Sequence, residues 1–244
     1  MLKGMYIAAS GMNFQATAVV EGAANLANIN TPGYKRTMLV GESFGDYVTR
    51  FEHLQAGDRV GLGTRAVGTA RHESQGALIR TQNPLNVALS GNGYFQTLAA
   101  DGRVQATRNG DFILDAAGFL ATQTGERILG VDSNPLRVNT LTGGEFRIRE
   151  DGTIFSGNAQ VGRLKVVDAP NPGAGNFPVS ARFAPVTTDA FQVKQGYLEG
   201  SNVNVVTEMV ALMTGNRAFS FGQKAITTQD NLLNKVANEL GRVQ

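Results

Sequence analysis

The stretch VVTEMVALMTGNRAFSFGQKAITTQDNLLNKVANEL, residues 205–240, decides the fold at the C-terminal end of the chain. An apolar residue recurs there at every seventh position, which is the period of a seam between helices that pack side by side. The members of this row are Val205, Leu212, Phe219, Ile226, Leu233 and Leu240. The pattern predicts a long C-terminal helix whose apolar row needs a partner helix.

A second row of this helix, four residues after each member of the first, is partly polar. Its members are Met209, Asn216, Gln223, Asp230 and Ala237. Gly215 and Gly222 lie in the same helix and weaken it by about 1 kcal/mol each relative to alanine. A partly polar row suits contacts with further copies of the chain.

The N-terminal end has the same period over residues 5–30, with larger residues in one row and alanines in the other. The larger row is Met5, Met12, Val19 and Leu26, and the alanine row is Ala9, Ala16 and Ala23. We expect this helix to end between Asn28 and Thr31, because Pro32 disfavours helical geometry in the residue before it. Each helix could be an ordinary surface helix. Two such repeats at opposite ends of the chain instead favour a coiled-coil pair formed by the two helices.

The middle of the chain, residues 85–197, is β-like. Short strands over residues 103–107, 112–114, 127–131 and 161–167 alternate with turn signals of the Asp-Gly, Asn-Gly, Ala-Gly and Thr-Gly type. Strands spaced this closely predict an antiparallel meander. The Pro- and Gly-rich stretch 170–178 is predicted to be a loop.

These patterns together predict an α+β fold. A terminal helical assembly domain comprises residues 1–36 and 198–244, and its two helices form a coiled-coil layer. Residues 37–84 form an extended connector, and residues 85–197 form a mainly antiparallel β domain. The 244 residues are long enough for a substantial core.

Composition excludes several kinds of site. The chain has no cysteine, which rules out disulfides, thiolate zinc sites and cysteine nucleophiles, and it has only two histidines, His53 and His72. A formal net charge of +2 does not give the basic surface that nucleic-acid binding requires. No unbroken apolar segment is long enough for a cleaved signal peptide or a membrane span.

No catalytic, cofactor or metal site is predicted. Residues 61–66 fit the letters of a dinucleotide-binding fingerprint, but no buried strand precedes them and no helix follows. Asp111 and Asp115 could form a carboxylate pair, but both flank turns, where aspartate caps the backbone. We therefore expect no enzymatic activity and no small-molecule substrate.

Motifs at both ends resemble those of the bacterial flagellar rod and hook proteins, the axial family. The N-terminal motif is similar to the family pattern N-N-L-A-N-x-x-T-P-G-[YF]-[KR], with Ala24 in place of the first Asn, and the C-terminal motif is similar to L-E-x-S-N-V-N. The matching residues are Asn25, Leu26, Ala27, Asn28, Thr31, Pro32, Gly33, Tyr34, Leu198, Glu199, Ser201, Asn202, Val203 and Asn204.

Two further motifs in the middle resemble the same family. Residues 84–95, PLNVALSGNGYF, are similar to its entry into the β domain, and residues 107–112, TRNGDF, are similar to its T-R-[ND]-G-x-F hairpin. The resemblance covers nearly the whole chain. The length favours a rod subunit over a hook protein, and the compact middle favours a proximal over a distal rod protein.

The resemblance implies a structural subunit that polymerises into a helical tube and transmits torque from the motor to the hook. Its implied partners are other copies of itself, neighbouring rod and hook proteins and the flagellar type III export apparatus. Its implied location is the basal body, reached without cleavage of a signal peptide. A hook-type protein, a glycan-binding or glycan-cleaving β protein and a cytoplasmic coiled-coil adaptor are the alternatives.

Overall fold

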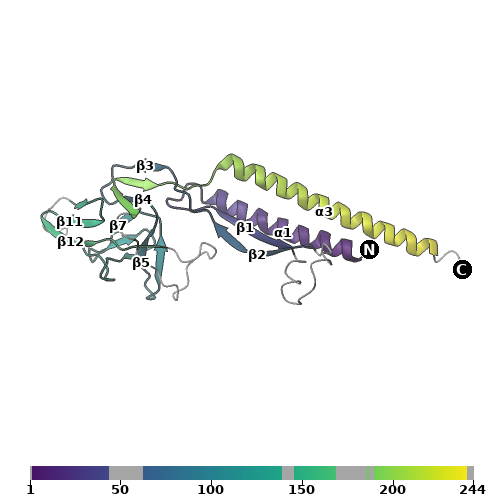
Figure 1. Ribbon diagram of the computed structural model, residues 1–244, viewed down its shortest axis with the longest axis horizontal. Helices are drawn as coiled ribbons and strands as arrows, with labels where there is room; N and C mark the ends of the chain where they lie inside the picture. Colours follow the sequence, from purple (N-terminus) through teal and green to yellow (C-terminus); the bar gives the residue numbers. More distant parts are fainter. Residues whose placement is uncertain (1, 44–62, 139–145, 169–185, 187–189, 241–244) are drawn as a thin grey trace. The chain divides into compact units, whose positions relative to one another are not determined.

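The structure is a computed structural model (Figure 1). It describes residues 2–43, 63–138, 146–168, 186 and 190–240. The chain forms two compact units. A helical unit comprises Met1–Ala27, Thr37–Ala70 and Asn204–Gln244, and a β unit comprises Asn28–Arg36 and Arg71–Val203.

Of the predicted domain boundaries, only the one after residue 36 coincides with a boundary between these two units. The segment 37–84 includes strands of both units, because Thr37–Ala70 belongs with the helices and Arg71 onward with the β unit. The division into an assembly domain, a connector and a β domain therefore stays a prediction.

The helical unit contains helix α1 (Leu2–Ala27) and helix α3 (Val205–Leu240). Strands β1 (Thr37–Ser43) and β2 (Thr64–Arg71) form a two-stranded sheet. Helix α1 stops just before the Asn- and Pro-rich turn, close to the predicted end. Helix α3 begins after Asn204, whose side-chain Oδ1 accepts a hydrogen bond from Thr207 N at 3.1 Å, as an N-cap does.

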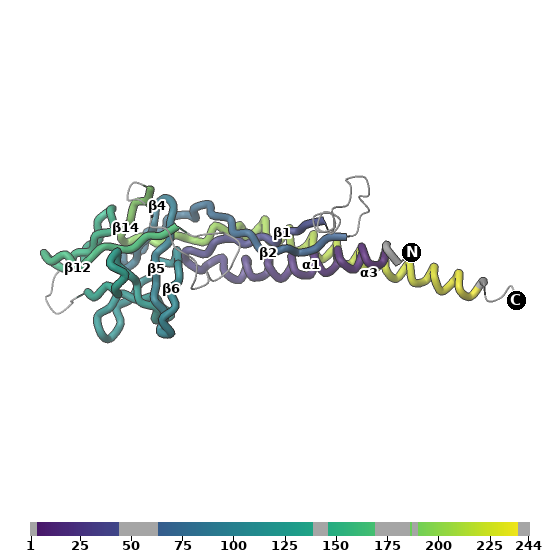
Figure 2. The backbone as a smooth tube through the Cα atoms, turned by 60° about the horizontal axis from the view of Figure 1, so that its bottom comes forward, coloured from purple at the N-terminus to yellow at the C-terminus, as the bar shows by residue number. Residues whose placement is uncertain are grey.

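Helices α1 and α3 lie side by side (Figures 1 and 2). Their pairing is antiparallel, because Gly22 of α1 lies against Leu212 near the start of α3, whereas Met12 of α1 lies against Gly222 further along. Gly215 likewise lies against Val19. The glycines that weaken α3 are therefore the positions where large side chains of α1 approach its backbone.

The predicted rows of large residues are mostly half-buried. Met5, Met12, Val19 and Leu26 of α1 are all half-buried. So are Leu212, Phe219, Ile226 and Leu233 of α3, whereas Val205 is exposed, and the side chain of Leu240 lies outside the described part.

The second row of each helix lies three residues after the larger row, not four as the sequence pattern indicated. In α1 this row is Ala8, Gln15 and Gly22, and in α3 it is Glu208, Gly215, Gly222 and Gln229. The alanine row Ala9, Ala16 and Ala23 is exposed, as are Met209, Asn216, Gln223, Asp230 and Ala237. Three members of this row, Gly22, Gly215 and Gly222, are glycines that side chains of the other helix approach closely.

The β unit consists of antiparallel sheets. Its largest sheet has the order β13-β5-β9-β8-β7, with β6 on the other edge of β5; the remaining sheets are β10-β11-β12, β14-β4 and β15-β3. The strands are β3 (Leu78–Arg80), β4 (Val87–Gly91), β5 (Tyr94–Leu98), β6 (Val104–Thr107), β7 (Phe112–Leu114), β8 (Leu120–Thr122), β9 (Arg127–Ile128), β10 (Phe146–Ile148), β11 (Thr153–Ser156), β12 (Ala159–Arg163), β13 (Val166–Val167), β14 (Phe191–Gln195) and β15 (Tyr197–Glu199).

The core of this unit is a single apolar cluster drawn from most of these strands. Phe95 and Phe112 pack edge to face at its centre, with ring centroids 5.2 Å apart. The other buried members include Val87, Leu89, Leu120, Ile128, Ile154 and Val193.

Several sequence-based expectations are confirmed here. The α+β class and the antiparallel pairing hold, and the strand at residues 112–114 has the predicted bounds. The meander is confirmed over β7-β8-β9 and over β10-β11-β12, but β5 departs from it because it pairs with β6, β9 and β13. The strand predicted over 161–167 is interrupted between β12 and β13. The predicted loop 170–178 lies outside the described residues.

Candidate functional site: the Glu199 cluster and the helix faces

A buried carboxylate organises the part of the β unit where the terminal motifs meet. Glu199, at the end of β15, has a side chain with no solvent exposure. Its Oε1 accepts a hydrogen bond from Lys35 Nζ at 2.6 Å, and its Oε2 accepts one from Arg108 Nη1 at 3.1 Å. The backbone N–H of Gly76 donates a third, at 3.0 Å. We call Lys35, Arg108 and Glu199 the Glu199 cluster.

The cluster contains two cations and one anion, so its net charge is positive. Backbone carbonyl oxygens accept further hydrogen bonds from both cations. Lys35 Nζ also donates to Ser74 O at 2.9 Å, and Arg108 Nη2 donates to Gly91 O at 2.6 Å. The Arg108 guanidinium lies 5.3 Å from the centroid of the Tyr94 ring, within the range of a cation–π interaction. The buried charges are thus held by hydrogen bonds on several sides, as burial requires.

The same cluster joins three of the motifs that sequence analysis singled out. Lys35 ends the N-terminal motif, Arg108 belongs to the TRNGDF hairpin and Glu199 belongs to the C-terminal motif. Gly33 N donates to the backbone carbonyl of Glu199 at 2.7 Å. Gly33 has a φ of 70°, and a side chain there would collide with the backbone of Arg108. A glycine is therefore required at this crossing.

Asn202 fastens the two terminal motifs to a third segment. Its side-chain oxygen accepts a hydrogen bond from Arg36 N at 2.7 Å, and its amide nitrogen donates to His72 O and Ser74 O at 2.7 and 2.9 Å. Asn202 N also donates to Tyr34 O at 3.3 Å. The chain entering the β unit and the chain leaving it are thereby held next to each other.

The other motif residues act in local turns or packing. Asn28 O accepts from Thr31 N at 3.2 Å, Ser201 Oγ accepts from Val203 N at 3.2 Å, and Leu198 pairs with Ile79 across β15 and β3. Leu26 lies in the helix seam, Ala27 ends α1, Pro32 is half-buried in the turn and Val203 is buried.

A second polar cluster lies inside the helical unit. Asn25 is buried, and its side chain donates to Thr37 O at 2.8 Å and accepts from Thr37 N at 3.0 Å. Its amide nitrogen lies 3.5 Å from Glu208 Oε2 of α3. Asn25 therefore connects α1 to both β1 and α3.

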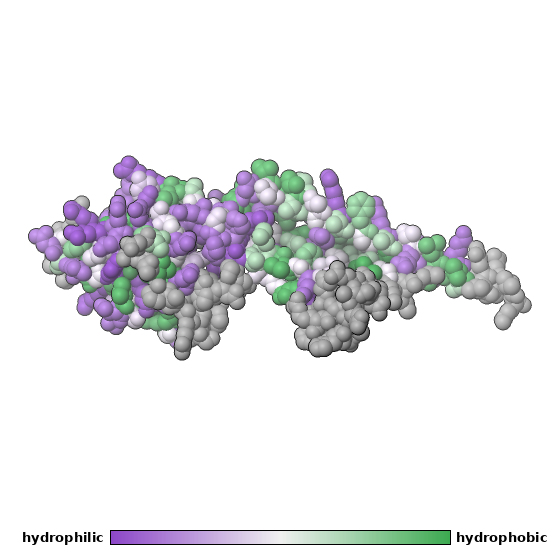
Figure 3. Space-filling model, viewed as in Figure 1, coloured by the Kyte–Doolittle hydropathy of each residue, from purple (hydrophilic) through white to green (hydrophobic). Residues whose placement is uncertain are grey.

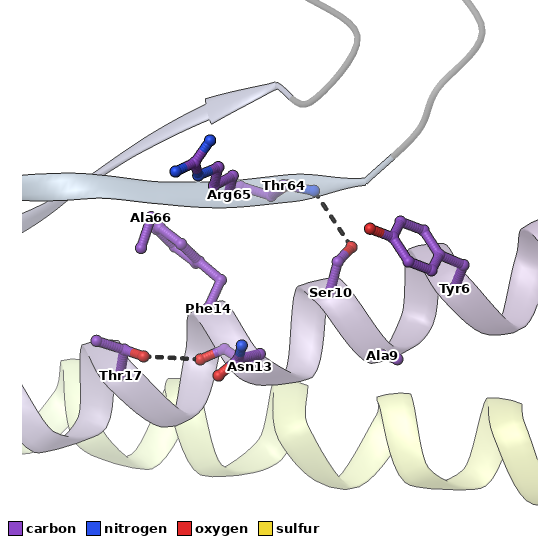
Figure 4. Close-up of a pocket in the computed structure, with 9 residues that line it drawn as sticks. All are labelled: Tyr6, Ala9, Ser10, Asn13, Phe14, Thr17, Thr64, Arg65 and Ala66. Carbon is purple, nitrogen blue, oxygen red and sulfur yellow. Dashed lines mark hydrogen bonds between the residues drawn. The ribbon is translucent and has the colours of Figure 1, made fainter. Parts of the chain in front are cut away.

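A hollow of about 610 Å³ opens between α1 and β2 (Figure 4). Tyr6, Ser10 and Phe14 point into it from α1, and Thr64 N donates to Ser10 Oγ at 3.3 Å. Ala9, Asn13, Thr17, Arg65 and Ala66 complete its walls. Among the described residues, this lining contains no carboxylate and no imidazole.

The two aspartates considered as a carboxylate pair, Asp111 and Asp115, instead accept local hydrogen bonds. Asp111 Oδ2 accepts from Gln123, and Asp115 Oδ1 accepts backbone N–H groups at residues 117 and 119. The N–H of Phe119 is the main cause that lowers the pKa of the Asp115 carboxyl.

Among the described residues, His72 does not lie in a recognisable catalytic arrangement. His72 Nδ1 lies 2.7 Å from Ser74 Oγ in an exposed position, and His53 lies outside the described residues. Residues 61 and 62 of the glycine-rich fingerprint are outside them too, and Thr64–Ala66 open strand β2 rather than a helix. Among the described residues, no group of three His, Asp or Glu side chains could hold a metal ion.

Tyr94 is a titratable group that the sequence did not indicate. Its hydroxyl donates a hydrogen bond to the Glu73 carboxylate. Burial, together with this neighbouring negative charge, raises the pKa of the Tyr94 phenol above its usual range.

Sequence reasoning missed the Glu199 cluster and the buried Asn25–Glu208 contact. Glu199 itself could have indicated the Glu199 cluster, because it lies within a short strand and a buried charged residue needs a partner. The partners themselves gave no signal, since Lys35 and Arg108 lie 164 and 91 residues from Glu199.

None of the helices in the described ranges combines the length and the apolar character needed to span a membrane.

Comparison with known proteins gives three family matches in chain order. Residues 5–35 match "Flagella basal body rod protein", residues 88–156 match "Flagellar hook protein FlgE/F/G D1 domain", and residues 194–240 match "Flagellar basal body rod FlgEFG protein C-terminal". Each of these three ranges contains one residue of the Glu199 cluster.

Whole-chain relatives agree with these matches. The flagellar basal-body rod protein FlgG of Agrobacterium fabrum is 34% identical over 98% of this chain and 100% of its own length. FlgG of Borreliella burgdorferi is 30% identical over 99% and 100%, respectively. The flagellar basal-body rod protein FlgF of Escherichia coli is 32% identical over 97% of this chain and 95% of its own.

Proposed function

Because the chain belongs to the family of flagellar basal-body rod proteins, we propose that it is a structural subunit of the rod that polymerises through its terminal helices. Relatives of the FlgG and FlgF types match at similar identity, so the chain is of FlgF/FlgG type. The preference for a proximal position in the rod stays a prediction.

The observation that carries this proposal is the apolar surface that the helical unit leaves exposed. Large apolar side chains remain in solvent along both helices although α1 and α3 already pack together. They are Tyr6, Ile7, Val20, Val205, Val206, Met209, Val210, Met213, Phe221, Leu232 and Val236. Apolar surface of this kind marks a site of protein association.

The 3-4 spacing of the seam supports a coiled-coil arrangement of α1 and α3, in which the larger row of each helix faces small residues of the other. In the assembled tube, the helical units form the inner layer and the β units the outer one. Contacts between unlike faces of successive subunits grow an open helix rather than a closed ring. Such a tube carries torque from the motor to the hook.

Partners and location follow from the same proposal. The subunit contacts further copies of itself and the neighbouring rod and hook proteins, and it reaches the basal body through the flagellar type III export apparatus without cleavage of a signal peptide. Within this role the chain has no catalytic task. The predicted seam residues, including the exposed rows, act as assembly contacts.

Replacing Ile226 by aspartate tests the proposal. Ile226 is half-buried in the row of α3 that faces α1, so Ile226→Asp places a charge where it must lose water. We expect this variant to retain β-unit circular dichroism but to be absent from purified basal bodies and to leave cells non-motile. Ala225→Asp, at the exposed neighbouring position, is the matched control and should be incorporated normally.

Two results would contradict this reasoning. Normal incorporation of Ile226→Asp would mean that the row has no role in assembly. Loss of the β-unit signal together with the helices would mean that the two units share one folding core.

A further inference from the structure

The sheet β10-β11-β12 of the β unit has one apolar side and one side that carries arginines. Its register places Arg147 directly opposite Phe155, and Phe155 opposite Gln160. Side chains that face each other across an antiparallel pair lie on the same side of the sheet. Ile148 and Ile154, their neighbours along the chain, belong to the apolar core of the unit. Since successive side chains alternate, Arg147, Phe155 and Gln160 lie on the side away from the core.

Two more arginines belong to this outer side. Thr153, which alternates with Phe155 along β11, pairs with Arg163 of β12. Arg149 follows Arg147 at the end of β10, and its guanidinium carbon lies 4.7 Å from the centroid of the Phe155 ring. That distance is within the range of a cation–π interaction. We call Arg147, Arg149, Phe155 and Arg163 the arginine face.

The arginine face is accessible to solvent. Arg147 and Arg149 are exposed, and Phe155 and Arg163 are half-buried. Strands β11 and β12 lie at one end of the β unit in Figure 1, and Figure 3, in the same view, shows mainly hydrophilic side chains at this end. A partner can therefore reach the guanidinium groups without any rearrangement of the core.

The acidic residues beside the arginine face do not pair with its half-stacked and half-buried arginines. The turn between β10 and β11 carries Glu150 and Asp151, and both Asp151 carboxylate oxygens accept from Thr153, at 3.0 and 2.8 Å. Arg163 Nε donates to the backbone oxygen of Asp151, at 2.8 Å. Among the described residues, no carboxylate forms an ion pair with Arg149 or Arg163.

Other exposed arginines of the β unit do have a carboxylate partner. Arg103 pairs with Asp101, and Arg127 pairs with Asp115 at 3.0 Å. The guanidinium group offers its N–H donors in a rigid planar fork that fits the two oxygens of a carboxylate. The arginine face thus presents forks of this kind whose carboxylate the described part of the chain does not supply.

We propose that the arginine face docks an acidic segment of another protein, whose carboxylates bind the guanidinium groups of Arg149 and Arg163. The Phe155 ring holds the Arg149 guanidinium in place before the partner arrives, which lowers the entropy lost on binding. Arg147 adds a positive charge beside them. A protein segment fits better than a nucleic acid, because Arg149 already stacks on the Phe155 ring and leaves less of it for a base.

This inference goes beyond the proposed rod function, because it concerns the β unit and a partner that is not a further copy of the terminal helices. Binding at the arginine face can be measured on full-length protein that has not polymerised. Its outcome is therefore separate from the incorporation test with Ile226→Asp.

Fluorescence anisotropy tests the proposal, with a labelled oligoglutamate peptide as the probe and dilute full-length protein as the titrant. An oligoglutamine peptide of the same length is the uncharged probe. Arg149→Gln removes the positive charge, whereas Arg149→Lys keeps the charge and removes the planar fork. Arg80→Gln is the matched control, because Arg80 is an exposed arginine of the same unit that lies on β3.

We expect wild-type protein to bind oligoglutamate and not oligoglutamine. Arg149→Gln should raise the Kd about tenfold, the factor that corresponds to the loss of one charge-assisted hydrogen bond. Arg149→Lys should lie between wild type and Arg149→Gln, and Arg80→Gln should stay within about twofold of wild type. Because Arg149 is exposed, circular dichroism and thermal unfolding should be the same for all variants.

Three results would overturn the proposal. Oligoglutamate that binds no better than oligoglutamine would mean that the arginine face does not bind carboxylates. Equal weakening by Arg80→Gln and Arg149→Gln would mean a diffuse attraction to the whole unit. Tighter binding of inorganic polyphosphate of matched charge would mean that the face takes phosphate groups, as a nucleic acid would supply, rather than an acidic protein segment.

Discussion

Replacing Glu199 by glutamine tests the buried cluster directly. Glutamine keeps the size of the side chain but removes its charge, so Lys35 and Arg108 lose their shared counter-ion while staying buried. Its amide nitrogen is also a donor that faces groups which are donors themselves. Breaking a buried ion pair from one side costs about 3–5 kcal/mol, because the remaining charge is left uncompensated.

The assay is equilibrium unfolding of the β unit in urea, followed by circular dichroism. With a slope of about 2 kcal/mol per M, a loss of 3–5 kcal/mol lowers the midpoint by about 2 M. Asp101→Asn is the control, because the Asp101–Arg103 pair is exposed, with its nitrogen and oxygen 2.5 Å apart. Exposed pairs contribute little, so that variant should unfold close to wild type.

A second substitution separates charge from packing. Adding Lys35→Met to Glu199→Gln removes one of the two unpaired cations and should recover part of the lost stability. If Glu199→Gln shifts the midpoint by less than the control does, the two cations are solvated in the folded protein and the reasoning from burial is refuted.

The remaining predictions concern other elements. Gly222→Ala should destabilise the helical unit by about 1–2 kcal/mol, because a methyl group has no room there, whereas Gly11→Ala in α1, with open space around it, should stabilise it by about 0.5–1 kcal/mol; thermal unfolding of the two variants checks this. The backbone N–H two residues after Asp151 lowers the pKa of its carboxyl, so its contribution to stability is present above about pH 4 and is lost as the pH falls through the folded value. Asp151→Asn should therefore flatten the acid limb of a plot of urea midpoint against pH. Asn25→Asp removes a buried donor and sets a carboxylate beside Glu208, which should cost about 3 kcal/mol of unfolding free energy, measured in urea.

The heptad rows could be predicted because the seven-residue period of apolar residues is visible in the sequence itself. Leu212, Phe219 and Ile226 are half-buried, and their role as seam residues stays a prediction. The side on which the second row lies was not predictable. Positions three and four residues away flank the first row equally, and the apolar content favoured the alanines. In the structure, the row with Gly215 and Gly222 is the one that Val19 and Met12 of α1 contact, because a glycine leaves room for a large side chain.

The site was less predictable than the fold. The motifs around Gly33 and Asn202 are visible in the sequence, but the partners of their side chains are not. In the structure, Asn202 bonds to backbone groups within its own β unit. Such pairings are set by how distant segments cross, which neither periodicity nor composition encodes.

The pairing of Glu199 with Lys35 also sets an order for folding. Contacts that span 164 residues form late, since a long loop must close first. A chain that stops short of Glu199 leaves two cations without a counter-charge. If it stops before β14, it also leaves β3 and β4 without their partners β15 and β14. Such a fragment lacks α3 as well, so it has neither the packing of α3 on α1 nor the exposed apolar side chains of α3. We therefore expect nascent and truncated copies to be excluded from a growing polymer, because their own fold closes only when the C-terminal segment is present.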